Sequence, residues 1–382
     1  MNRDLSEFRS RVWEAYERRH YRRAALIARE GVRIAVQQQD EAGEIRFRWI
    51  EGALQVIQGC YEAAFACYSN TVALIERARL DLRDPEVADL AARAYGDWAN
   101  AAALLPNGPP EGIRDVLERQ TAFINGRGLR EMTCEMYHAR SICLARLGDH
   151  QGALQAAEEG IALRRANPEW PGCRLDHHLQ IYAERLVDQK RWDDAAAVVS
   201  EGMDLYGSAG YWDLRGRMRL EQGDIDCAIA DLEEAAARDS DSDSLRMLGI
   251  ALLLRGDRER AFDRFRGARA ARPQEVENSL WMAAASGETY MLGAEFERAG
   301  FERQVVEFYL GRIPARELIE RAGNAPSPFT RRAWLSTAHG FAGVWNEFRG
   351  DRSAAVDHYK SCRDAAVPGC QLGIWAARRL DG

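Results

Sequence analysis

Apolar side chains recur at helical spacing in the segment from Ser242 to Gln274. Leu245, Leu248 and Leu252 follow an i, i+3, i+7 pattern, which predicts an apolar stripe on one face of a first helix. A second stripe follows at i, i+4, i+7 between residues 261 and 268, and its side chains are small, large and small. The two stripes predict a pair of helices that pack against each other.

Glycine, aspartate and proline mark the ends of these two helices. Gly249 lies on the first stripe, where the missing side chain lets the partner helix approach closely. Gly256 tolerates the left-handed conformation that ends a helix, and Asp257 can cap the N-terminus of the next helix. Pro273 ends the unit because proline cannot continue a helix. The segment therefore predicts one helical hairpin.

This hairpin resembles the tetratricopeptide repeat, a unit of roughly 34 residues. The resemblance rests on the two glycines, the two alanines of the second stripe, the aromatic Phe265 between them, and Pro273. A single hairpin of this kind cannot bury its apolar face alone, so several must stack. The resemblance implies an all-α fold, a right-handed α-solenoid of about eight hairpins.

The same template recurs along the chain. The units 209–241 and 134–167 keep the Gly-Asp pair, while the unit 176–208 has Lys190-Arg191 in its place and must close its turn with ordinary residues. Weaker matches continue toward the N-terminus, at residues 20–24 and 52–68, and in two helices expected at 84–105 and 111–123 around a turn at Pro106–Pro110.

The C-terminal part is less regular. Gly293 and Gly300 keep a seven-residue spacing, and Gly350-Asp351 restores the template. The segment Phe308–Ala322, which precedes a break at Asn324–Pro328, is similar to the C-terminal part of certain bacterial tetratricopeptide lipoproteins. No stretch shows the period-two alternation of a strand. We expect three regions: irregular repeats over 1–133, regular repeats over 134–274, and degenerate repeats with a cap over 275–382.

Composition fits an ordered protein of 382 residues, with 46% hydrophobic and 29% charged residues. Its apolar runs are too short to cross a membrane, and the N-terminus lacks a signal pattern, so we expect a cytoplasmic protein without a membrane partner. The net charge of −7 argues against broad binding of nucleic acid. Lys190 and Lys360 are the only lysines among the basic residues, which fits a GC-rich bacterial genome.

The sequence carries no known catalytic motif. A phosphate-binding glycine loop, a zinc-protease helix and a nucleophile elbow are all lacking. His177 and His178 are adjacent and diverge by about 100° on a helix, so they cannot easily ligate one metal ion. The eight cysteines form no CxxC, although Cys362 and Cys370 could pair or bind a metal. We expect no enzyme activity, no cofactor and no metal.

Candidate binding residues follow from the resemblance. In tetratricopeptide arrays the second, fifth, ninth and twelfth positions of each first helix usually face a concave groove. Those positions lie off the apolar packing stripe, and they select His138, Ile142, His177, Gln180, Glu184, Asp213, Arg217, Arg246 and Ile250. No unit has the Lys-plus-Asn pair with which some members clamp a carboxylate. Trp13, Tyr16 and Trp49 on the N-terminal first helices could instead form an apolar landing site.

These features favour a non-catalytic scaffold or adaptor that binds a partner protein or peptide segment in the groove. A peptide-sensing regulatory receptor and an accessory subunit of an enzyme complex are the alternatives. Association of two copies through the terminal repeats is also conceivable, because the last helix carries Leu372, Ile374, Trp375 and Leu380.

Overall fold

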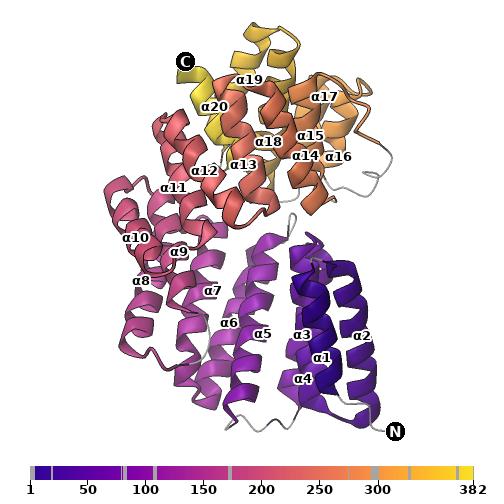
Figure 1. Cartoon of the computed structure of the whole chain (residues 1–382), viewed down its shortest axis with the longest axis vertical. Coiled ribbons are helices and arrows are strands. Elements are labelled where there is room, and N and C mark those ends of the chain that lie inside the picture. The colour runs from indigo at the N-terminus through magenta and orange to yellow at the C-terminus, as the bar shows by residue number, and fades with distance from the viewer. Residues whose placement is uncertain are drawn as a thin grey trace. The chain divides into compact units, whose positions relative to one another are not determined.

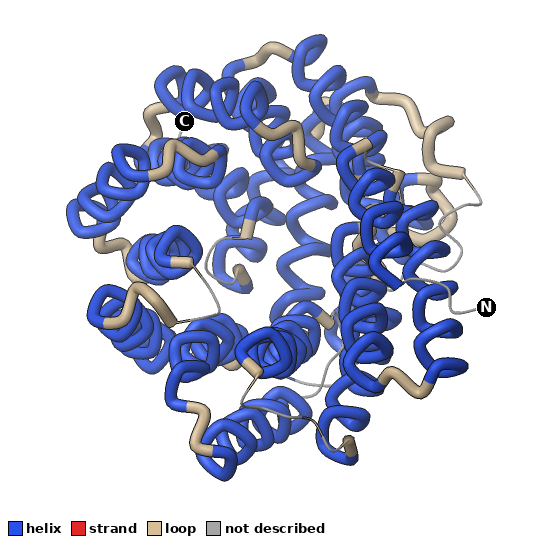
Figure 2. The backbone as a smooth tube through the Cα atoms, turned by 60° about the horizontal axis from the view of Figure 1, so that its bottom comes forward, coloured by secondary structure: helices blue, strands red, loops and turns tan. Residues whose placement is uncertain are grey.

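The computed structural model describes residues 5–18, 20–78, 80, 84–105, 110–170, 174–273, 275–293, 301–325, 328–366 and 370–381, without the side chains of residues 85, 110, 131, 328 and 329. In these ranges the chain forms helices and turns but no strand (Figure 2). No helix among them is long and apolar enough to span a bilayer. The expected positions Pro106–Pro109, Gly300 and Pro326-Ser327 lie outside the described residues.

Packing divides the chain into two compact units, Met1–Arg185 (unit 1) and Leu186–Gly382 (unit 2). The helices are labelled in Figure 1. Unit 1 contains α1 (Leu5–Glu17), α2 (Tyr21–Gln38), α3 (Glu41–Ile57), α4 (Tyr61–Arg77), α5 (Pro85–Leu104), α6 (Pro110–Arg127), a short 3-10 turn (Arg130–Met132), α7 (Thr133–Arg146), α8 (His150–Ala166) and most of α9 (Leu175–Asp188).

Unit 2 continues the series of helices and adds a less regular C-terminal part. Its helices are α10 (Trp192–Leu205), α11 (Ala209–Gln222), α12 (Ile225–Arg238), α13 (Ser242–Arg255), α14 (Arg258–Ala271), α15 (Val276–Ser286), α16 (Glu302–Tyr309), α17 (Ala315–Gly323), α18 (Pro328–Phe348), α19 (Arg352–Ala365) and α20 (Gln371–Asp381). The boundary between the two compact units lies between Arg185 and Leu186 in the sequence. The three regions expected from repeat regularity were defined on a different basis and stay a prediction.

The hairpin expected at residues 242–274 is confirmed as α13 and α14. A Cβ atom on Gly249 would lie 2.5 Å from Cε1 of Phe265, so only glycine permits this approach of the two helices. The interior of the hairpin is fully buried at Leu248, Leu252 and Ala261. Removal of apolar surface from water stabilises a fold by about 25 cal/mol per Å². The burial of these side chains therefore holds the two helices together.

The Gly-Asp turns have one conformation throughout both units. Their glycines have φ between 83° and 95°, and each aspartate side chain accepts a hydrogen bond from a backbone N–H of the helix that it caps. These turns are Gly148-Asp149, Gly223-Asp224, Gly256-Asp257 and Gly350-Asp351. Lys190 takes the same left-handed region with φ 57°, so an ordinary residue does close that turn, as predicted.

An aromatic cluster forms the centre of the C-terminal part of unit 2. The Trp281 ring on α15 stacks on Phe265, with ring centroids 5.7 Å apart. It also meets Phe341 of α18 and Trp375 of α20, each with a centroid distance of 5.5 Å. The indole N–H of Trp375 donates to the hydroxyl of Tyr359 at 2.9 Å. The cluster thus ties α15, α18, α19 and α20 to the regular hairpin α13/α14.

Candidate functional site

The predicted groove residues are divided between the two units. His138, His177, Gln180 and Glu184 belong to unit 1, as do Trp13 and Trp49, whereas Asp213, Arg217 and Arg246 belong to unit 2.

In unit 2, Arg246 on α13 is the centre of a buried polar network. Its side chain is 7% exposed. The guanidinium donates to Oε2 of Glu275 at 2.8 Å and to Oδ1 of Asn278 at 3.1 Å, and it also pairs with Asp243. Its Nε donates to Oε1 of Gln371, the first residue of α20, at 2.8 Å. All these contacts are made within the chain.

Asp213 and Arg217 on α11 belong to the same region of unit 2. Nε of Arg217 lies 2.7 Å from Oδ2 of Asp213, one helical turn away. Burial raises the pKa of the Asp213 carboxyl, and the neighbouring Arg217 charge lowers it by a smaller amount. The charged side chains at the predicted groove positions of unit 2 therefore pair with other charged side chains of the same protein.

The C-terminal helix covers this side of unit 2. Helix α20 packs on α18 and α19 and contacts α11 and α13 (Figure 1). Gln371 reaches Arg246 at one end of α20, and at the other end the guanidinium of Arg378 lies beside Gly223. Arg246 and Asp213 therefore do not have the solvated positions that the repeat template predicts. Gln371 of the later helix α20 bonds to Arg246, and Asp213 is buried beside Arg217 and Ser244. Their part in binding a partner stays a prediction.

In unit 1 the first helices carry polar side chains that face one another. The indole N–H of Trp49 on α3 donates to Oδ2 of Asp97 on α5 at 2.7 Å. Burial raises the pKa of Asp97 to about 7, and the nearby charge of Glu135 on α7 contributes in the same direction. Asn100 lies one turn further along α5, and its buried Oδ1 has no hydrogen-bond partner within the described ranges.

Helix α7 continues this face. Glu135 and His138 are three residues apart, so their side chains share one side of the helix. Glu135 is 4% exposed and packs over Gly96, where an added Cβ would lie 2.6 Å from Oε1 of Glu135. Burial lowers the pKa of His138 to about 3, with smaller contributions from His178 and His177. The imidazole is therefore neutral near pH 7.

Helix α9 supplies the next side chains. The ring centroid of His138 lies 6.4 Å from that of His177 and 5.4 Å from that of His178. His177 is exposed and Gln180 and Glu184 are half-buried, on the same face of α9. We call the set Trp49, Asp97, Asn100, Glu135, His138, His177, Gln180 and Glu184 the unit 1 face.

The unit 1 face combines hydrogen-bond donors and acceptors, several of them on buried side chains. Among the described residues, no group of three His, Cys, Asp or Glu side chains is placed to hold a metal ion. Buried atoms without a hydrogen-bond partner in the described chain include Oδ1 of Asn100, Nδ1 of His138 and Oγ of Ser141. Such atoms are rare in folded proteins and are normally satisfied by water or by a ligand.

Trp13 is an exposed aromatic residue of α1. Its side chain is 51% exposed, and its ring meets that of Tyr16 edge to face with centroids 5.4 Å apart. Trp49 is half-buried and bonded to Asp97, and the landing site that it was expected to form with Trp13 stays a prediction.

The chain was compared with known proteins by sequence and by structure. No protein-family model matches the sequence, and a search of curated proteins found no match. The structure is similar to the Rap conjugation gene regulator of plasmid pLS20, solved in complex with the Phr* peptide, with 11% identity, a TM-score of 0.52, and coverage of 87% of this chain and 92% of that one.

Two further solved structures are similar at lower TM-scores. A thermophilic TPR protein of Thermus thermophilus has 15% identity, a TM-score of 0.37, and coverage of 63% of this chain and 98% of that one. The human IFIT1 dimer with PPP-AAAA has 15% identity, a TM-score of 0.48, and coverage of 93% and 81%. The chain has the fold of tetratricopeptide-repeat proteins. The predicted all-α solenoid class is confirmed by the succession of helical hairpins in each unit.

Within this tetratricopeptide fold, Asp97, Asn100 and Glu135 were not predicted from the sequence. The first two lie on the degenerate third pair of helices, where the template could not assign groove positions. A signal was present, because Asp97 and Asn100 interrupt an alanine-rich helix at a spacing of three residues.

Proposed function

We propose that the protein is a non-catalytic interaction scaffold that binds an extended segment of a partner protein along the unit 1 face. The observation that carries the proposal is the row of polar side chains on α5, α7 and α9, which includes buried atoms without a partner in the described chain. Backbone amide and carbonyl groups of a bound segment would form hydrogen bonds with the accessible polar side chains at the edge of this row. Exposed His177 and half-buried Gln180 would contact the segment at the open side.

The electrostatics of this face favour a segment with little charge. His138 is neutral near pH 7, and Asp97, with a pKa of about 7, is only partly ionised there. Binding of a strongly charged group against buried Glu135 would carry a desolvation cost. We therefore infer that backbone contacts and the Trp49 ring, rather than ion pairs, supply most of the affinity.

A second candidate is a receptor for a free regulatory peptide. The similar Rap regulator was solved with a peptide, and its structure matches most of this chain. The two candidates differ in the ligand: a scaffold retains a protein in stoichiometric amount, whereas a receptor retains a short peptide that raises the melting temperature.

The test is a pull-down from the source organism, with mass spectrometry, using the wild type and two double variants. H177A/Q180A removes two polar side chains from the unit 1 face. Q151A/Q155A removes two exposed polar side chains from the second helix α8 and serves as the matched control. We expect the partner to be lost or strongly depleted with H177A/Q180A and retained with the control. Equal recovery with both variants would place the binding surface elsewhere.

A further inference from the structure

A cavity of about 400 Å³ lies in unit 2, away from the helix faces discussed above. Its apolar lining comes from Phe308, Ile313 and Trp345, and its polar lining from Arg312, Asn346 and Arg349. We call it the Trp345 pocket. No acidic side chain lines it in the described part of the chain.

Two helix ends build the Trp345 pocket. Helix α16 ends at Tyr309, and Gly311 follows it with φ 69°. The N–H of Arg312 donates to the carbonyl oxygen of Glu307 at 2.9 Å. This left-handed ending turns the chain sharply and places Arg312 next to the end of α16. Helix α18 ends in the same way at Gly350, directly after Arg349. The segment Y-L-G-R-I-P at residues 309–314 therefore encodes half of the pocket.

The apolar side chains of the pocket are held in place. The Trp345 ring stacks on Tyr309 with centroids 4.3 Å apart and an interplanar angle of 28°. Phe308, Ile313 and Trp345 are each less than a tenth exposed, so they pack into the core of unit 2 while lining the cavity. A pre-formed apolar surface of this kind needs little ordering when a ligand binds.

The rim of the pocket carries positive charge that no described residue pairs with. Arg312 and Arg349 are exposed, and neither forms an ion pair with another residue that the structure describes. The guanidinium of Arg349 lies over the Trp345 ring, 5.6 Å from its centroid. Both arginines follow helix C-termini, where the helix dipole favours a positive charge.

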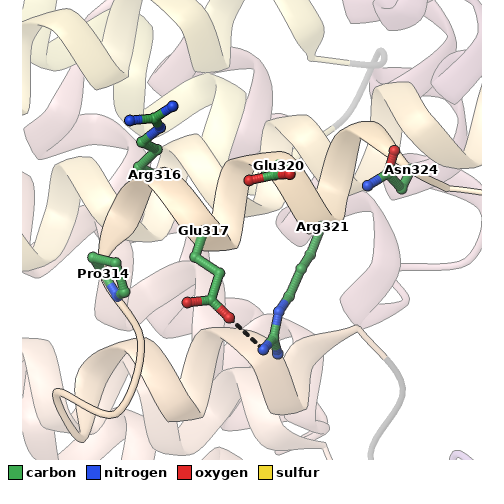
Figure 3. A pocket seen from close by; sticks show the side chains of 6 residues that line it. All are labelled: Pro314, Arg316, Glu317, Glu320, Arg321 and Asn324. Carbon is green, nitrogen blue, oxygen red and sulfur yellow. Dashed lines mark hydrogen bonds and ion pairs between the residues drawn. The ribbon is translucent and has the colours of Figure 1, made fainter.

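A neighbouring cavity shows the contrast. It shares Pro314 with the Trp345 pocket and is lined by charged residues of α17 (Figure 3). There Arg321 lies 2.5 Å from Oε1 of Glu317 and 3.3 Å from Oε2 of Glu307. That cavity contains its own carboxylates, Glu317 and Glu320. The Trp345 pocket is lined by two guanidinium groups and, among the described residues, by no carboxylate.

We propose that the Trp345 pocket is a second binding site, for an acidic peptide segment that inserts one aromatic or large aliphatic side chain. Guanidinium groups bind carboxylates through paired hydrogen bonds, and they are better suited to this than ammonium groups. The volume of about 400 Å³ accommodates one large side chain of the segment. Because the site lies outside the unit 1 face, this inference goes beyond the proposed scaffold surface.

The test selects ligands from a phage-displayed library of random nonapeptides on the intact wild-type protein, with counter-selection on R312E/R349E. Enriched peptides should carry Asp or Glu within two positions of Phe, Trp or Leu. Their affinity, measured by fluorescence anisotropy, should fall about tenfold or more in R312E/R349E and by a smaller factor in R312Q/R349Q. Replacing their acidic residues by amides should weaken binding to the wild type by a comparable factor.

A matched control separates the pocket from general surface charge. R316E/R331E makes the same change in net charge at two exposed arginines outside the Trp345 pocket, and it should leave affinity unchanged within about twofold. H177A/Q180A should also bind the peptides normally, which keeps this result independent of the scaffold proposal. The inference is overturned if no peptide is enriched over R312E/R349E, if the enriched peptides lack acidic residues, or if the control variant loses affinity equally.

Discussion

At the scale of single residues, close approach of helices depends on a few glycines. Gly249 faces Phe265, which is fully buried, so the Cβ of an alanine would have to displace an aromatic ring that cannot move into solvent. We expect G249A to lower the free energy of unfolding by about 1–3 kcal/mol, the usual cost of overpacking a core. Urea denaturation followed by circular dichroism measures this change.

Gly267 in the same hairpin provides the control for G249A. An added Cβ there would lie 3.4 Å from the nearest atom, a methyl group of Leu245, which is close to ordinary contact. We expect G267A to be neutral or to stabilise by up to about 1 kcal/mol, because alanine is the better helix former. The packing account fails if both variants shift the unfolding midpoint in the same direction and by the same amount.

Asp97 sets a second expectation at this scale. Burial and the charge of Glu135 raise its pKa to about 7, so the folded state holds this proton more tightly than the unfolded chain does. The resulting stabilisation is present below about pH 4 and is lost as the pH rises toward 7. Asn cannot ionise but can still accept the Trp49 hydrogen bond. We therefore expect D97N to exceed the wild type in stability by on the order of 2 kcal/mol at pH 8.

The stability difference for D97N should shrink as the pH is lowered to 5. Urea denaturation at both pH values measures it, and D115N, which changes an exposed aspartate of α6, should leave the profile unchanged. If the free energies of unfolding of D97N and the wild type differ by the same amount at both pH values, the pKa of Asp97 is not raised in the folded protein.

The turns were predictable from the sequence at this scale, whereas the burial of groove residues was not. Gly256 and Asp257 act through their own backbone and side-chain conformations, so the local sequence suffices. The pKa of Asp97 depends on Glu135, which is distant in sequence. The burial of Arg246 depends on Gln371, which is 125 residues away. Such contacts carry no local signature.

At the scale of secondary-structure elements, α20 determines which surface of unit 2 is accessible. Its side chains Leu372, Trp375 and Ala376 are almost fully buried. The sequence suggested an interface between copies for this helix. Its apolar side chains are buried within unit 2, where they cap the preceding helices, and association of two copies stays a prediction. The template could not predict that the cap would also reach α11 and α13.

Loss of the α20 anchor should loosen unit 2. W375A removes a side chain that is 1% exposed and that contacts Trp281 and Tyr359, so we expect a loss of about 3–5 kcal/mol. Hydrogen–deuterium exchange should show faster exchange in α13, α18 and α20, with α2, α3 and α4 unchanged. D381A, at the exposed end of α20, should alter neither region. Unchanged exchange in α13 with W375A would contradict a capping role for α20.

At the scale of the whole molecule, the repeat template is used differently in the two units. In unit 2 the chain's own last helix covers the groove positions around Arg246 and pairs with them. In unit 1 the corresponding face keeps buried polar atoms without a partner in the described chain and exposes His177. A change in the charge of Arg246 should therefore affect the stability of unit 2. Substitutions of His177 and Gln180 should instead affect the affinity for a partner.

The central claim is that a partner segment binds along the unit 1 face, and the affinity of the recovered partner tests it most directly. Isothermal titration calorimetry would compare the wild type, H177A/Q180A and Q151A/Q155A at pH 7.5. We predict that H177A/Q180A raises the Kd by about tenfold or more, because two contacts of about 1 kcal/mol each are lost. The Kd of the α8 control should stay within about twofold of the wild-type value. Equal affinities for the two double variants would contradict the claim.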